Sequence, residues 1–137
     1  MRFAVYLLIL LGAPLSAFAG NSETRDAMNP ESLNRTISIT DAGVMPQTLR
    51  IANEDISVFI LNDTSDSLVS LEIDFGKTVV HCNNKNLKVT PDGKLTTVKP
   101  IGPRDFLATC FHEKGRYPLK FVGIKGRGPI SGEVILE

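Results

Sequence analysis

The sequence predicts an all-β protein, a Greek-key β-sandwich of seven or eight strands. Three observations carry this prediction. Short runs in which apolar and polar residues alternate recur from residue 36 to the end of the chain, and alternation with a period of two is typical of strands that bury one face. Residues with turn-forming chemistry separate the runs, and no stretch keeps a helical period.

The predicted strands follow one another closely. The runs are 36–40, 47–51, 56–61, 68–73, 78–80, 87–89, 95–98, 106–111, 117–122 and 133–136, of which 87–89 and 95–98 are the weaker. Segments such as Asp41-Ala42-Gly43 and Pro91-Asp92-Gly93 provide the turns between them. Alternation places one set of side chains in the core: Val58, Ile60, Leu71, Ile73, Thr109, Phe111, Tyr117, Leu119, Val134 and Leu136.

The first 19 residues read as a secretory signal. Arg2 precedes an apolar run over residues 3–11, and Ala17-Phe18-Ala19 is a small-x-small cleavage site. The run is too short to span a bilayer, which needs ~20 apolar residues. An uncleaved anchor is the alternative. We therefore expect three parts: a signal peptide (1–19), a flexible N-terminal lead (20–35) and one domain (36–137), in a protein that leaves the cytoplasm.

Composition excludes some partners. The chain has 15 basic and 15 acidic residues, and a nucleic-acid surface would need a basic excess. After signal cleavage no later segment is apolar enough to insert in a membrane. The two cysteines, Cys82 and Cys110, most often form a disulfide in an oxidising compartment. Metal ligation and two free thiols are the other possibilities.

Two segments resemble cupredoxins. Residues 39–51 contain Gly43-Val44-Met45-Pro46 followed by Leu49-Arg50-Ile51, which is similar to the opening strands of that superfamily. Residues 111–117 resemble the hairpin that leads, in cupredoxins, to the strand with the copper cysteine. The resemblance covers about residues 36–137 and implies a cupredoxin-like fold.

The resemblance does not carry over the type 1 copper ligands. The cysteine position of the family corresponds to Phe121, the late histidine to Ile124 and the methionine to Pro129. The early histidine falls near Leu68 or Val69. A blue-copper site needs a thiolate beside two imidazoles. We therefore expect no type 1 copper, and packing side chains where the metal would lie.

Within the superfamily, the chain is most similar to the EfeO-type domains of bacterial iron uptake. Residues 69–80 resemble their strand-turn-strand with a central Glu and Gly, and Phe121-Val122-Gly123 resembles a segment of small stand-alone members. This resemblance implies a periplasmic accessory of iron transport, or of copper handling, that works beside a membrane permease. Iron or copper is thus the cofactor to consider, without a blue-copper centre.

The candidate metal ligands are few: Glu72, His81, His112 and Met45. Iron, as a hard ion, would favour Glu72 with imidazole, whereas Met45 would favour Cu(I). A set of two cysteines and two histidines also exists, in His81-Cys82 and Cys110-Phe111-His112, but it lacks the close Cys pair usual in structural zinc sites. Motifs of hydrolases and metalloproteases are missing, so we expect no enzyme.

A second function competes with metal handling. The sandwich would then be a metal-free interaction module that docks to a membrane or periplasmic partner. Two surfaces are candidates for the docking: the basic loop over residues 123–128, and the rim around Met45. The apolar residues at the former copper positions favour this interpretation.

Overall fold

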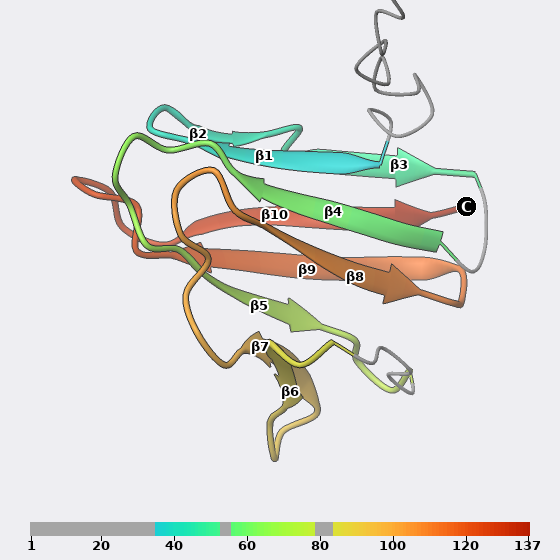
Figure 1. The fold of residues 1–137 in the computed structure, drawn as a ribbon. Helices are drawn as coiled ribbons and strands as arrows, with labels where there is room; N and C mark the ends of the chain where they lie inside the picture. Colours follow the sequence, from blue (N-terminus) through green and yellow to red (C-terminus); the bar gives the residue numbers. More distant parts are fainter. Residues whose placement is uncertain (1–34, 53–55, 79–83) are drawn as a thin grey trace, which may run out of the picture.

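The computed structural model describes residues 35–52, 56–78 and 84–137. Over these ranges the chain forms ten strands and no helix (Figure 1). The strands are β1 (Thr36–Thr40), β2 (Gly43–Met45), β3 (Thr48–Ile51), β4 (Ile56–Asn62), β5 (Ser70–Asp74), β6 (Leu87–Val89), β7 (Lys94–Thr97), β8 (Phe106–Phe111), β9 (Gly115–Val122) and β10 (Ile130–Leu136). Accordingly, the described part of the chain contains no helix capable of crossing a membrane.

The strands form two sheets. One sheet has four strands in the order β2-β1-β4-β8, and the other has six in the order β3-β10-β9-β5-β7-β6. Strands β1 and β4 are parallel, as are β3 and β10, and the remaining pairs are antiparallel. The chain crosses between the sheets several times, for example from β4 to β5 and from β7 to β8. The predicted all-β sandwich is confirmed.

The number of strands differs from the prediction of seven or eight. Two of the ten, β2 and β6, have three residues each and lie at sheet edges. Strand β2 forms because the turn after β1 folds the chain back on itself. The Thr40 hydroxyl accepts a hydrogen bond from the Ala42 amide and donates one to the Gly43 carbonyl, and Gly43 has a φ of +140°. Most of the predicted strand 78–80 lies outside the described residues.

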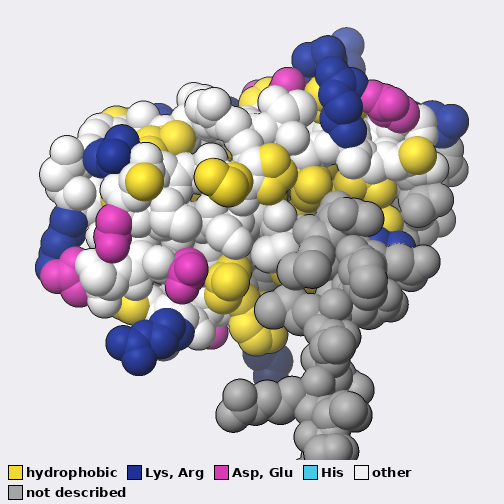
Figure 2. Space-filling model, turned by 90° about the horizontal axis from the view of Figure 1, so that it is seen from above, with side chains coloured by type: hydrophobic (Ala, Val, Ile, Leu, Met, Phe, Trp, Pro, Cys, Tyr) yellow, Lys and Arg dark blue, Asp and Glu magenta, His cyan; other side chains and the backbone are white. Residues whose placement is uncertain are grey.

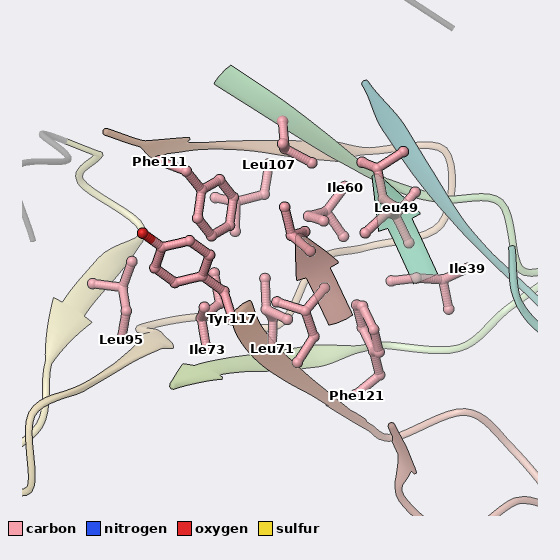
Figure 3. Packing of buried hydrophobic residues seen from close by; sticks show 14 of the residues in the cluster. Ile39, Leu49, Ile60, Leu71, Ile73, Leu95, Leu107, Phe111, Tyr117 and Phe121 are labelled. Carbon is pink, nitrogen blue, oxygen red and sulfur yellow. The ribbon is translucent and has the colours of Figure 1, made fainter. Parts of the chain in front are cut away.

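One hydrophobic core fills the space between the sheets (Figure 3). All ten side chains predicted to point inward are buried. Three aromatic rings meet at one end of this core: the ring centroids of Phe75 and Phe111 are 5.5 Å apart, and those of Phe111 and Tyr117 are 4.8 Å apart. Burying each large apolar side chain contributes ~1.5–3 kcal/mol, so this core accounts for most of the favourable free energy of folding.

Candidate interaction surface

The positions that correspond to copper ligands in the resemblance lie at one end of the sandwich. We call this region, made by residues 62–69, 99–105 and 123–129, the loop end. Phe121, Ile124 and Val69 are buried in the core, as expected for packing side chains. Leu68 and Pro129 are exposed, so these two positions do not help to fill the core. The family resemblance alone did not reveal this exposure.

Hydrogen bonds to a buried amide hold the loop end together. The Asn62 side-chain nitrogen donates to the carbonyls of Ser67 (2.8 Å) and Ile101 (2.7 Å). Its oxygen accepts hydrogen bonds from the amide (3.1 Å) and the hydroxyl (2.7 Å) of Thr64. This amide uses both donors and its acceptor on the protein itself. Hydrogen bonds from the Asn62 side chain therefore join the segment 62–69 to the segment 99–105.

The basic loop over residues 123–128 is also tied to its neighbours. The Lys125 amide donates to the Ser67 hydroxyl (3.0 Å), and the Lys125 ammonium forms an ion pair with Asp66. The Arg127 Nε donates to the Asp41 carbonyl (2.9 Å). Both cations thus have partners within the molecule. Of the two docking surfaces considered from the sequence, the rim around Met45 is therefore the one whose side chain is more available to a partner, because Met45 is largely exposed.

Glu72 lies on the outer face of the six-stranded sheet. Its carboxylate accepts a hydrogen bond from the Lys94 ammonium at 3.0 Å. This hydrogen bond to Glu72 raises the pKa of Lys94. A metal ion at Glu72 would have to compete with this cation.

Met45 lies on the other side of the molecule, because it shares the outer face of the four-stranded sheet with its paired residue Ser38. Packed sheets are ~10 Å apart, so Glu72 and Met45 cannot coordinate one ion. The cross-strand row of Met45 reaches β8 at Phe106. His112 follows six residues later, ~20 Å along the strand direction.

The structure therefore separates Met45 from both Glu72 and His112. Among the described residues, no three His, Cys, Asp or Glu side chains form a group that could hold a metal ion. His81 lies outside these residues, so its pairing with His112 stays a prediction. Cys82 also lies outside them, and the disulfide between Cys82 and Cys110 on β8 likewise stays a prediction.

Among the described residues, the strands of the four-stranded sheet carry no charged side chain on their outer face. None of its strands, β1, β2, β4 or β8, contains Asp, Glu, Lys or Arg. The outward side chains, which we call the uncharged face, are Thr36, Ser38, Thr40, Met45, Ser57, Phe59, Leu61, Phe106, Ala108 and Cys110. The outer face of the six-stranded sheet instead carries ion pairs, among them Glu72–Lys94 and Arg116–Glu133.

Large apolar side chains stand out from the uncharged face. Met45 is 72% exposed and Phe106 is 59% exposed. Phe106 contacts the half-buried Phe59 with ring centroids 6.3 Å apart and a tilt of 60°. Scattered apolar residues are common on protein surfaces, but contiguous apolar patches mark interaction sites. This face is the feature that sequence reasoning missed, apart from Met45.

A hollow adjoins the uncharged face beside β2. It has a volume of about 320 Å³, and its lining includes Val44, Met45, Gln47, Arg127 and Ile130. Seen from above, where β2 and β1 lie uppermost in Figure 1, hydrophobic side chains gather across the middle and charged ones lie toward the periphery (Figure 2). The lining of the hollow places the apolar side chains of Val44 and Ile130 near Met45.

The arrangement defines an all-β sandwich with an uncharged, partly apolar face. The sequence matches no known family model, and no curated protein is detectably similar to it. The fold is similar to that of a solved structure, the dithionite-reduced auracyanin from the photosynthetic bacterium Roseiflexus castenholzii. The two chains share 14% identity with a TM-score of 0.49, over 74% of this chain and 94% of the auracyanin. Similarity at this level transfers neither a ligand set nor a function.

Proposed function

We propose that this protein is an exported, cupredoxin-like interaction module, which acts by docking to a partner and holds no type 1 copper. One observation supports this proposal above the others: the uncharged face presents Met45 and Phe106 to solvent. The cores of protein interfaces are likewise depleted of charged residues and enriched in aromatic residues and Met.

The energetics favour docking at this face. Burying apolar area is favourable by ~25 cal/mol per Å², and a face without charges avoids the large cost of removing ions from water. The outer face of the six-stranded sheet lacks this advantage, since ion pairs such as Arg116–Glu133 are solvated there. A partner would therefore gain more by covering the four-stranded sheet.

The partner's class rests on the sequence resemblance alone. Similarity of residues 69–80 and 121–123 to the EfeO-type proteins suggests an accessory role in iron or copper handling beside a membrane permease. In this proposal the module acts through protein–protein contact, and it catalyses no reaction. Direct metal carriage is the competing role, and it would need His112 with His81, or Glu72 released from Lys94.

Calorimetric titration with Fe(II), Fe(III), Cu(I) and Cu(II) tests the proposal. We expect no saturable binding and, with Cu(II), no intense visible band of thiolate-to-copper charge transfer. Glu72→Ala and His112→Ala test the candidate ligands. Glu133→Ala is the matched control, because Glu133 is also an outward glutamate that pairs with a cation, Arg116. Saturable binding that Glu72→Ala or His112→Ala abolishes and Glu133→Ala keeps would contradict a metal-free module.

A further inference from the structure

One cross-strand row of the uncharged face has exposed apolar side chains at both ends. Strand pairing places Met45 opposite Ser38, Ser38 beside Leu61, and Leu61 opposite Phe106. The row therefore runs across all four strands, from β2 at one edge to β8 at the other. Met45 and Phe106, its two ends, are the most exposed apolar side chains of the face.

We propose that the uncharged face binds a second copy of this chain, sheet against sheet, in a two-fold symmetric dimer. This inference rests on the proposed function and names the docked partner. The symmetry axis would run parallel to the strands, between β1 and β4. It would place β1 of each copy over β4 of the other, and β2 over β8. Such an interface is isologous: each contact occurs twice.

The row is complementary to itself under this symmetry. Rotation about an axis along the strands keeps each row facing the same row of the other copy. Met45 of one copy then meets Phe106 of the other at both edges of the interface. A thioether beside an aromatic ring is a favourable contact. A partner of different sequence would need to supply this complementarity independently, whereas a second copy has it already.

The lack of charge also suits a second copy. Because a second copy presents the same face, a charged group there would need an opposite charge elsewhere on that face, and without one it would lose its hydration unpaired. The uncharged face has no Asp, Glu, Lys or Arg on any of its strands. The Thr and Ser side chains of β1 are small and allow close approach. We therefore expect added salt to leave the dimer intact.

The area of the uncharged face indicates how strongly two copies should associate. The four strands have 3, 5, 7 and 6 residues, and at ~3.3 Å per residue and a spacing of ~4.8 Å they cover on the order of 300 Å² per copy. Stable complexes bury ~800 Å² per partner, whereas weak and transient ones bury less. The dimer should thus be weak and reversible, and it should form as the concentration rises.

Sedimentation equilibrium of the full chain as the cell produces it, over about a hundredfold range of concentration, tests the proposal. The average mass should rise from one copy toward two. Met45→Lys and Phe106→Glu should each weaken association by about tenfold or more, because each buries a charge against an apolar group. Both residues are largely exposed, so the fold should survive.

The double variant Met45→Lys/Phe106→Glu gives the sharpest result. The symmetry places Lys at position 45 of one copy against Glu at position 106 of the other, so association should return toward the wild-type level. Val122→Lys on β9 and Val89→Lys on β6 are matched controls, since both remove an exposed valine from the six-stranded sheet. They should leave association unchanged.

Three results would overturn the dimer: a single copy at every concentration, association that Phe106→Glu leaves unchanged, or a double variant weaker than both single ones. None of these results bears on metal binding. Failure of the dimer can therefore be told apart from failure of the proposed function, which the metal titrations decide.

Discussion

Replacing Asn62 by alanine removes a buried amide that makes four hydrogen bonds at the loop end. The amide of Thr64 is left without a partner, whereas the carbonyl of Ile101 keeps the bond from the Val69 amide (3.0 Å) and the carbonyl of Ser67 keeps a longer bond from the Thr64 hydroxyl (3.3 Å). Each buried polar group left unsatisfied costs ~1–3 kcal/mol. Adding ~1 kcal/mol in total for the weakened bonds to the two carbonyls, we expect the free energy of unfolding to fall by ~2–4 kcal/mol.

Urea denaturation followed by circular dichroism measures this loss. Asn86→Ala is the matched control, since the Asn86 amide also joins two segments by donating to the carbonyl and accepting from the amide of Lys99. These bonds are exposed, and water replaces them at a cost of ~1 kcal/mol or less. If Asn62→Ala were no more destabilising than Asn86→Ala, the buried amide would not be what holds the loop end together.

Three further predictions concern the core and one turn. Phe121→Ala leaves a cavity in the core and should cost ~3–5 kcal/mol in urea denaturation, whereas Phe106→Ala on the exposed face should cost ~1 kcal/mol or less; similar losses would mean that Phe121 is not packed as described. Arg104 has a φ of +63° in the turn before β8, so Arg104→Gly should raise the free energy of unfolding by ~1 kcal/mol; a loss would show that the side chain stabilises the turn. Burial raises the pKa of Tyr117, so tyrosinate forms less readily in the folded chain. The contribution of Tyr117 to the free energy of unfolding should therefore be fully present below the unfolded pKa of ~10 and should be lost as the pH rises above it. Urea denaturation at several pH values measures this decline, and Tyr117→Phe should lessen it.

Much of the fold could be predicted from local pattern. Alternation in runs such as 56–61 and 117–122 showed which side chains point inward, because the face of a strand depends only on the parity of the position. The strand β2 was missed, since three residues are too few to show a period. Its formation depends on the turn at Gly43 and on pairing with β1.

The candidate site was harder to predict. Parity could show that Glu72 and Met45 point outward, but not that they do so from different sheets, because strand pairing is non-local. The signal for the uncharged face was present in the sequence: the segments 36–40, 43–45, 56–62 and 106–111 contain no charged residue. Only the order β2-β1-β4-β8 brings these four segments together.

The central claim is that this protein associates through its uncharged face. Nuclear magnetic resonance of the labelled chain at increasing concentration tests it most directly, since chemical shifts report contacts residue by residue. The account predicts concentration-dependent shifts at Met45, Leu61 and Phe106, with Glu72 and Lys120 on the other sheet unchanged. Shifts that cluster on the six-stranded sheet, or spectra that do not change with concentration, would contradict it.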